Sequence, residues 1–209
     1  MAAISTLTYT SELERAVRDF TADGVRIYDS DKVLEKLRGI PTFVADAYLA
    51  RISSGETEPR YDKIFLDKWG KKDAETKKNV EIPEMVFYRA ALLASDGLVS
   101  NDPSLDREQT TRQIFEKFVN REIIPNTPYM ANSGHYLLAN SIEDKLGESI
   151  SPKLKNELEQ EKRIRPQLFA CFVLDLYDSR KSIFYTLGNA AEIQAETGGT
   201  GFNFSNLRP

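Results

Sequence analysis

Cysteine and histidine are nearly missing from this chain of 209 residues, which has one of each, Cys171 and His135. A single cysteine excludes a disulfide within the chain, and a single histidine argues against a metal site built on nitrogen and sulfur ligands. No apolar run approaches the roughly 18–20 residues that cross a bilayer, and the N-terminus lacks the basic start and apolar stretch of a secretory signal. We therefore expect a soluble, cytoplasmic protein without a membrane partner.

A surplus of positive charge is also missing. The net charge is −4 at pH 7 and the isoelectric point is near 5.3, whereas a nucleic-acid surface is normally basic. We therefore expect no direct contact with nucleic acid. Hydrophobic residues make up 41% of the chain, which is ordinary for a globular protein, and the length allows one large domain or two small ones.

The first two thirds of the sequence favour helices. Apolar side chains recur there at helical spacing, and turn residues or proline separate the stretches. Asp31 is expected to cap the first helix, while Pro83 opens the third and Gly97 closes it. We expect helices at about residues 31–38, 43–52, 83–96, 107–121 and 152–162. Residues 55–80 are polar and punctuated, which predicts a loop or an extended arm.

The pattern changes near residue 167. Gln167–Leu176 is a short apolar run of strand length, typical of a strand that is buried on both faces. Asp178 and Ser179 offer a cap for a following helix, and Phe202–Leu207 is predicted to be a second strand. Strand, helix and strand make one βαβ unit, so a parallel sheet begins here. One such unit cannot bury its own sheet, so we expect this second domain to be incomplete in the chain.

The glycine cluster Gly198–Gly201 fits neither of the common phosphate-binding fingerprints. No Gly-Lys-Ser/Thr follows it, and Phe204 stands where a dinucleotide-binding motif needs its third glycine. The residues alone indicate a helix C-cap and a tight turn. The functional alternative is a close approach of the backbone to a ligand, because glycine leaves room and exposes its amide.

Cys171 lies within the apolar strand and also has two interpretations. A lone cysteine there is usually a small buried hydrophobe. The alternative is a redox thiol, but reversible two-electron chemistry needs a second sulfur within bonding geometry. That sulfur would have to come from another polypeptide or from further sequence.

Other polar residues leave a similar choice open. Asp178 either caps the following helix or hydrogen-bonds a ribose or base at the carboxyl end of a strand. Asn126–Pro128 and Asn132–His135 form either a loop of Asx and Ser/Thr turns or a set of donors around phosphate oxygens. His135 itself is expected to be a loop histidine without a chemical role.

Three segments, taken in order, resemble the start of the catalytic subunit of a ribonucleotide reductase. They are NTPYMANSG at residues 126–134, QLFACFVLDLYDS at residues 167–179 and TGGTGFNFSNLRP at residues 197–209. Their order and spacing match that family, with Cys171 placed 28 residues before Gly199.

The resemblance extends over roughly residues 82–209, and the first 80 residues carry neither a motif of the family nor a convincing nucleotide-binding cone. Ala170 departs from the Ser-Ser-Cys pattern of many aerobic members and is closer to the adenosylcobalamin-dependent class. The implied fold is a mainly α-helical domain followed by a ten-stranded α/β barrel made of two parallel halves. On that basis residues 1–80 would be a helical extension, residues 81–165 the helical reductase domain, and residues 166–209 the first βαβ unit of the barrel.

The resemblance implies a substrate site as well. Thr127 would help to hold the substrate phosphates, the Ala170 backbone and Cys171 would line the pocket, and Gly199 would approach the nucleotide through its main chain. Cys171 would be one of two thiols that reduce the 2′ position of a ribonucleotide while they become a disulfide.

An effector site is implied directly after the first strand, where Asp178, Ser179 and Arg180 would contact a deoxynucleotide or ATP. The other implied partners are the C-terminal remainder of the reductase with its thiyl cysteine, a thioredoxin-like reductant, and a second copy in a homodimer. Adenosylcobalamin would be bound mainly outside this chain, which would be inactive alone. The alternatives are a non-catalytic helical module that binds nucleotides or partners, and a structural module without a ligand.

Overall fold

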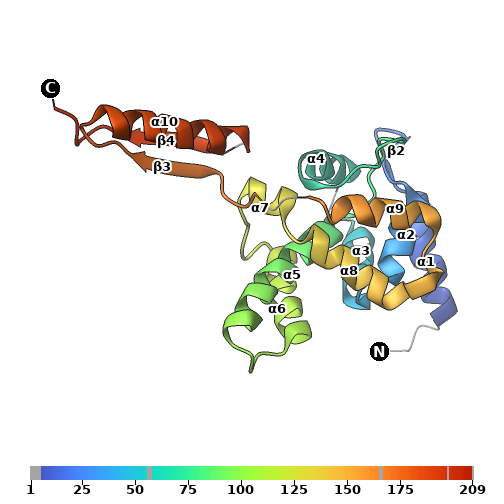
Figure 1. The fold of residues 1–209 in the computed structure, drawn as a ribbon. Coiled ribbons are helices and arrows are strands. Elements are labelled where there is room, and N and C mark those ends of the chain that lie inside the picture. The colour runs from blue at the N-terminus through green and yellow to red at the C-terminus, as the bar shows by residue number, and fades with distance from the viewer. Residues whose placement is uncertain (1–5, 56–57, 165–166, 197, 209) are drawn as a thin grey trace.

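The computed structural model describes residues 6–55, 58–164, 167–196 and 198–208. It shows a compact helical body, and beside it an extended unit made of two strands and one helix (Figure 1). The helices of the body are α1 Thr6–Arg18, α2 Ser30–Arg38, α3 Thr42–Ser54, α4 Pro59–Trp69, α5 Pro83–Asn101, α6 Arg107–Val119, α7 Thr127–Asn132, α8 His135–Leu146 and α9 Pro152–Glu161. A short antiparallel pair, β1 Thr21–Ala22 and β2 Val25–Arg26, follows α1.

Local chemistry explains where several helices begin and end. The Asp106 side chain accepts a hydrogen bond from the Gln109 amide at the start of α6, and Ser151 does the same for the Leu154 amide at the start of α9. Gly55 ends α3 in the left-handed conformation, at φ +67°. These caps satisfy backbone groups that have no partner within the helix.

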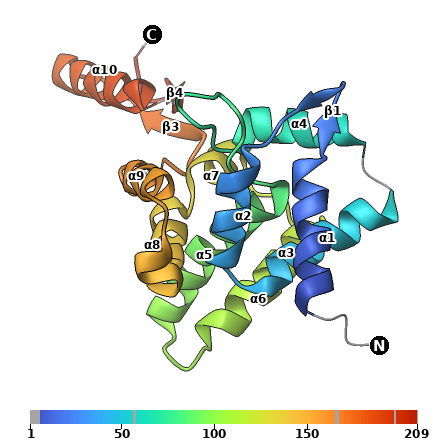
Figure 2. The ribbon, with the colours of Figure 1, turned by 90° about the vertical axis from the view of Figure 1, so that its right-hand side faces the viewer.

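One hydrophobic core joins the helices of the body. The central helix α5 packs against α3, α6, α7 and α8, and α2 lies between α1 on one side and the α8–α9 pair on the other (Figure 2). The core contains Val33 and Leu37 from α2, Met85 and Val86 from α5, and Leu158 from α9. Residues before and after position 80 therefore share this core.

Two expectations about the ends of helices were wrong. Asp31 does not cap α2, because the helix begins at Ser30 and Asp29 is its N-cap residue. Gly97 does not close α5, which continues to Asn101. Gly97 is exposed, and a Cβ added there would meet nothing within 4 Å. The helix therefore continues through this glycine.

The predicted loop at residues 55–80 contains α4. Phe65 and Leu66 are buried in the core, and the Asp62 carboxylate is buried against the guanidinium of Arg51, at 2.7 Å between Oδ1 and Nη1. The segment is polar because most of its charged side chains lie on exposed positions, and Asp62 adds a charge on the inner face of α4. The ion pair with Arg51 lets that charge enter the interior.

The predicted turn-rich stretch after α6 also contains helices. Asn126 caps the six-residue helix α7 by accepting a hydrogen bond from the Tyr129 amide, at 2.8 Å. His135 is the first residue of α8 and is buried, so the expectation of a loop histidine was wrong.

The extended unit is a βαβ unit, as the sequence predicted. Strand β3 spans Cys171–Asp175, helix α10 spans Arg180–Ala195, and strand β4 spans Gly199–Asn203. The two strands are parallel. Both are shorter than expected, and β4 begins three residues earlier than the predicted second strand. Thr197, the residue directly before the predicted helix C-cap and turn, lies outside the described residues.

The expectation that β3 is buried on both faces was wrong for this chain, because the Val173 side chain is 81% exposed. The sheet has two strands within the described residues, and α10 covers one of its faces. The helical part of the predicted fold is confirmed, whereas a ten-stranded barrel stays a prediction.

Gly134, between α7 and α8, provides a test of close packing in the body. Its φ is +70°, and an added Cβ would lie 1.8 Å from the carbonyl oxygen of Arg89. Gly134→Ala is therefore expected to lower the free energy of unfolding by about 2–4 kcal/mol, through left-handed strain and overpacking together. Gly55→Ala is the matched control, since its φ is +67° but nothing lies within 4 Å of the added Cβ. Urea unfolding of the two variants measures the difference, and equal losses would contradict the clash.

Candidate functional site

The structure brings together three of the predicted substrate-site residues, Ala170, Cys171 and Gly199. Cys171 and Gly199 are direct partners in the register of the parallel strands. The Gly199 amide donates a hydrogen bond to the Ala170 carbonyl oxygen at 2.8 Å. A Cβ at Gly199 would lie 3.3 Å from that oxygen, so glycine permits this close approach. A pair of residues 28 positions apart in sequence thus forms one small surface.

Cys171 is exposed, so its interpretation as a small buried hydrophobe was wrong for this chain. Alternation along β3 places Cys171, Val173 and Asp175 on the face that α10 does not cover. The Asn203 side-chain amide donates to Asp175 Oδ1 at 3.2 Å, which confirms that these two partner residues share the face. Gly201 pairs with Val173. The uncovered face therefore carries the thiol on β3 and two glycines on the neighbouring strand β4.

The opposite face of the sheet is packed against α10. The Gln194 side chain donates to Thr200 Oγ1 at 2.6 Å, and Thr186 donates from its hydroxyl to the Asp175 carbonyl at 3.2 Å. Gly198 fits between the helix and β3, because an added Cβ would lie 2.6 Å from Ile193 and 2.9 Å from Phe172. These contacts fix the turn that places Gly199 beside Cys171.

The predicted effector residues lie together at the start of α10. Ser179 is the N-cap residue, and its hydroxyl accepts from the Ser182 amide at 3.1 Å. Asp178 is not the cap. Its carboxylate instead pairs with Arg208 Nε at 3.1 Å, and both side chains are exposed enough for the pair to contribute little to stability. Arg180 is exposed and begins the helix.

Thr127, the predicted phosphate ligand, is the exposed first residue of α7. The same short helix ends at Asn132, whose side-chain amide donates to the Gln167 carbonyl oxygen at 2.9 Å. Gln167 lies four residues before Cys171, and Figure 1 shows α7 beside the segment that enters β3. The structure thus places the helix that carries Thr127 next to the approach to the cysteine strand.

Sequence reasoning missed a buried arginine that holds α7. Arg89 on α5 is fully buried, and its guanidinium donates to the carbonyl oxygens of Met130 and Ser133 at 2.8 Å each. It also donates to the Trp69 carbonyl at 2.7 Å and to Glu81 Oε1 at 2.9 Å. Arg89 is the one charged residue between Met85 and Ser95, and this was the available signal.

The Glu81 carboxylate compensates the charge of Arg89. Burial raises the pKa of Glu81, but the charge of Arg89, other neighbouring positive groups and the hydrogen bond from the Lys71 amide together outweigh this effect and lower the pKa to about 2. Its second oxygen accepts a hydrogen bond from the Lys71 amide at 2.8 Å. The pair therefore stays charged and connects α5, the segment after α4 and the end of α7.

His135 lies next to this pair and is held neutral. Burial lowers its pKa to about 3, and the charge of Arg89 acts in the same direction. Nε2 lies 3.0 Å from the Ala131 carbonyl oxygen, and Nδ1 is buried without a hydrogen-bond partner among the described residues. The geometry is that of a core histidine.

His135 is the chain's only histidine, so its titration can be followed by itself. Its folded pKa, about 3, lies below the ordinary 6.5, so the stability it contributes is present above pH 6.5 and is lost as the pH falls toward 3. Between pH 6.5 and 5 this loss is about 2 kcal/mol. NMR should show no titration of the ring between pH 7.5 and 5, and His135→Gln should remove this part of the pH dependence of unfolding. A ring that titrates near 6.5 would refute the assignment.

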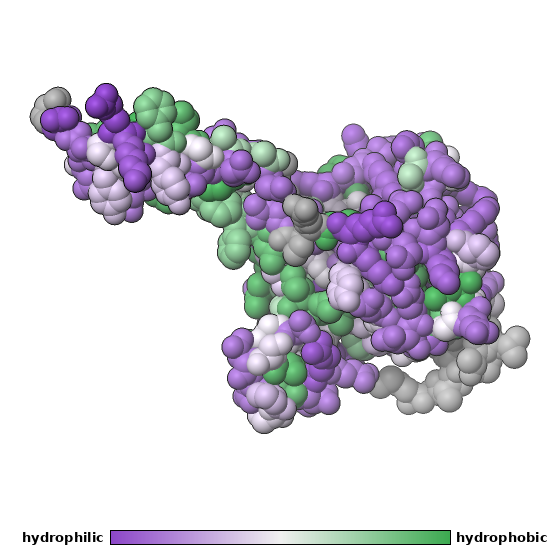
Figure 3. Space-filling view, in the orientation of Figure 1, coloured by the Kyte–Doolittle hydropathy of each residue, from purple (hydrophilic) through white to green (hydrophobic). Residues whose placement is uncertain are grey.

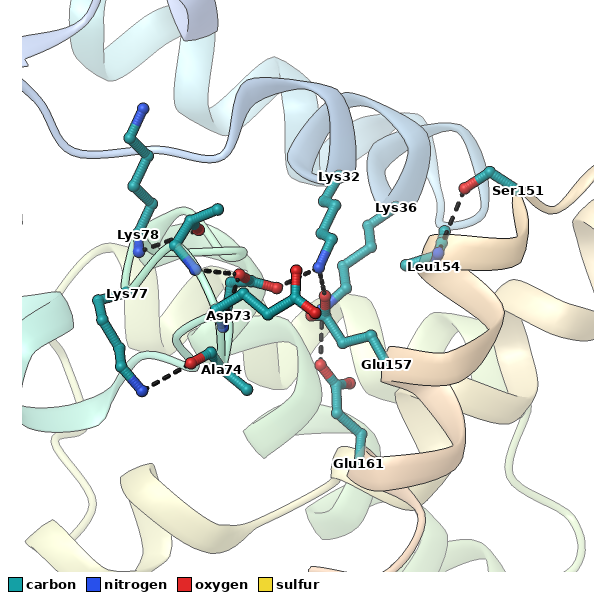
Figure 4. Close-up of polar contacts among 12 residues, drawn as sticks. Lys32, Lys36, Asp73, Ala74, Lys77, Lys78, Ser151, Leu154, Glu157 and Glu161 are labelled. Atoms are coloured by element: carbon teal, nitrogen blue, oxygen red, sulfur yellow. Dashed lines mark hydrogen bonds and ion pairs between the residues drawn. The ribbon is translucent and has the colours of Figure 1, made fainter.

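A second ionic cluster ties the first 80 residues to α9 (Figure 4). The fully buried Lys36 contacts Glu161 at 2.6 Å and Glu157 at 2.9 Å, and Lys32 contacts Glu157 at 2.9 Å and also Asp73. Burial lowers the pKa of Lys36, but the two glutamates offset this and raise it above its ordinary value. All of these charges are used within the protein, so the cluster is structural.

Neither a metal-binding cluster nor a membrane-spanning helix occurs in the part of the chain that the structure describes. It contains no group of three or more histidine, cysteine, aspartate or glutamate side chains that could hold a metal ion. None of its helices is both long and apolar enough to cross a membrane.

The chain combines a helical domain with a parallel βαβ unit that follows it. Cys171 is the first residue of the first strand of that unit. No family model matches the chain. Its sequence is 29% identical, over 90% of its length, to a vitamin B12-dependent ribonucleoside-diphosphate reductase of Thermoplasma acidophilum. It is 38% identical, over 48% of its length, to proteins of the same name from two strains of Mycobacterium tuberculosis.

The chain spans 23% of the Thermoplasma protein and 11% of the mycobacterial ones. The predicted resemblance to ribonucleotide reductases of the B12-dependent class is confirmed by these relatives, which are named as oxidoreductase enzymes.

Proposed function

We propose that this chain is the N-terminal part of a vitamin B12-dependent ribonucleotide reductase, and that Cys171 is one of its two reducing thiols. The observation that carries the proposal is the pairing of Cys171 with Gly199 on the uncovered face of the sheet. A structural module does not need an exposed thiol opposite a strand glycine. The similarity over 90% of the chain supports the same conclusion.

The substrate would be a ribonucleoside diphosphate, the class that the names of the relatives give. Thr127 would contact its phosphates through the hydroxyl. Ala170 and Gly199 would form a wall of backbone, and the missing side chain at Gly199 leaves room for the sugar. Cys171 would then face the 2′ carbon.

The chemistry accounts for the thiol. Replacing the 2′ hydroxyl by hydrogen breaks a carbon–oxygen bond, releases water and consumes two electrons and two protons. Cys171 and a second cysteine would supply them as they form a disulfide, and an external dithiol of the thioredoxin class would reduce that disulfide. The second cysteine must lie outside this chain, which has one. Isolated, the chain would therefore be inactive.

The cofactor would be held elsewhere too. Cys171 is exposed on the sheet face that α10 does not cover. The remainder of the reductase would therefore bind adenosylcobalamin, which supplies the radical chemistry that activates the substrate.

Effector control would act at the other end of β3. Asp178, Ser179 and Arg180 lie together where the strand meets the N-terminus of α10, and we assign them to a deoxynucleotide or ATP effector. We further propose a homodimer and a cytoplasmic location, in keeping with nucleotide reduction.

Apolar surface on the βαβ unit supports a partner for this chain. Val173, Phe184, Tyr185 and Leu187 are exposed, and Figure 3 shows hydrophobic residues in green on this unit and at its junction with the body. Surface of this kind marks an interaction site. The remainder of the barrel would cover it.

Reconstitution tests the proposal. The chain is mixed with a candidate remainder from the same genome, adenosylcobalamin, a dithiol and each of the four ribonucleoside diphosphates, and deoxynucleotides are measured. Product that depends on both polypeptides supports the proposal. Tight association without product would instead favour the alternative, a non-catalytic interaction module.

A further inference from the structure

Helix α7 is fixed from both sides. On the side of the helical body, the buried guanidinium of Arg89 donates to the carbonyl oxygens of Met130 and Ser133. Because Arg89 is fully buried and its charge is compensated by Glu81, these bonds hold the end of α7 firmly against α5. The Tyr129 hydroxyl adds a third bond, at 3.2 Å to the Ala90 carbonyl oxygen.

On the side of the βαβ unit, Asn132 extends the connection. Its amide donates to the Gln167 carbonyl at 2.9 Å, across 35 positions of sequence. From Gln167 the chain runs through Ala170, whose carbonyl oxygen accepts from the Gly199 amide. A continuous path therefore runs from the helical body through α7 to the two strands that carry Cys171 and Gly199.

We propose that Asn132 is a positioning residue that sets the place of the Cys171 strand relative to Thr127. This inference rests on the proposed function, in which Thr127 binds the phosphates and Cys171 faces the sugar of one nucleotide. The two groups lie on different structural units, and both must contact the same substrate. A bond between those units therefore determines how large a fraction of the free enzyme presents both groups in the arrangement that one substrate can bind.

Asn132 is a better residue than Arg89 for testing this proposal by substitution. Its side chain is partly exposed and lies at the end of a helix, so its loss should leave the body folded. Asn132→Ala removes the bond, and Asn132→Asp keeps the volume but replaces the donor by a carboxylate that cannot donate to a carbonyl. Asn101→Ala is the matched control, because the Asn101 amide donates to Gly97 within its own helix, at 2.7 Å.

The first measurement follows the distance between the two units in the 209-residue chain. Cys171 is the only native cysteine, and Tyr136→Cys supplies a second label position on an exposed site of α8. Spin labels at the two positions should give a narrow distance distribution. Asn132→Ala and Asn132→Asp should broaden it, whereas Asn101→Ala should not.

The second measurement uses the assembled reductase. Asn132→Ala and Asn132→Asp should raise the KM for the ribonucleotide about fivefold, the equivalent of one ordinary hydrogen bond, and should leave kcat within about twofold. Loss of folded enzyme would instead lower the maximal rate and leave KM unchanged, so KM separates positioning from stability.

Both results are needed. A broadened distribution with an unchanged KM overturns the proposal, and so does a raised KM with an unchanged distribution, which would mean direct contact of Asn132 with the substrate. Failure of the proposed function is seen separately, since the assembled enzyme with wild-type chain would then form no deoxynucleotide while the spin-label result would still report on the bond.

Discussion

Cys171→Ser should reduce deoxynucleotide formation by the assembled reductase at least about a thousandfold, the scale seen when a group that takes part in bond making is removed. Serine keeps the size and the exposed position on β3, but it cannot form a disulfide. The electrons for the 2′ carbon then have no source. The measurement is product formed per enzyme with a dithiol in excess, and substrate binding should be nearly unchanged.

The same reaction predicts a covalent product. Cys171 is the only thiol of this chain, so one turnover without external reductant should join the chain to a separately supplied remainder through a disulfide. A nonreducing gel would show the joined species, and dithiothreitol would release it. Val25→Ser, at an exposed strand position of the helical body, is the control and should keep both activity and the joined species. Full activity of Cys171→Ser with a dithiol would disprove the reductant role.

Arg89→Met should lower the free energy of unfolding by about 3–5 kcal/mol, the range for breaking a buried ion pair on one side. Methionine can fill much of the space, but Glu81 would remain buried with its partner gone, and three carbonyl oxygens would lose their donor. Chemical unfolding followed by circular dichroism measures the loss.

Two controls separate charge from packing. Arg38→Met removes an exposed arginine whose contact with Glu14 is 3.5 Å long, and it should cost less than about 1 kcal/mol. Adding Glu81→Gln to Arg89→Met removes the buried unpaired charge and should restore part of the loss. If the double variant were less stable than Arg89→Met, the burial of an unpaired Glu81 carboxylate would not be the cause.

The sequence predicted those elements whose local signals and tertiary environment agree. Helices α3 and α6 have apolar stripes and ordinary ends, and the βαβ unit has an apolar strand, a cap and a glycine stop. Two of the misses have a common physical origin. Asp62 and Arg89 are buried charges whose partners, Arg51 and Glu81, lie 11 and 8 residues away and outside the same helix, so no helical spacing pairs them.

The candidate site, too, was predicted in part from the sequence. The spacing of Cys171 and Gly199 matched that of a known family, and the structure made them strand partners. That Gly199 lies within a strand could not be expected from local propensity, because glycine indicates a turn. Arg89 and Asn132 support α7 through hydrogen bonds to backbone carbonyl oxygens. Every residue has such an oxygen, so residue type does not indicate which of them accept these bonds.

The two strands of the βαβ unit also bear on how such a protein is made. Within the described residues each strand has a free outer edge, and the Val173 side chain on β3 is open to water. Unpaired edges of this kind act as templates that recruit further strands, whether from the intended partner or from another copy. In the proposed reductase, the helical body would fold on its own core during synthesis and present these edges to the strands of the remainder. Co-expression with the partner would therefore guard the chain against aggregation, which begins at the same edges.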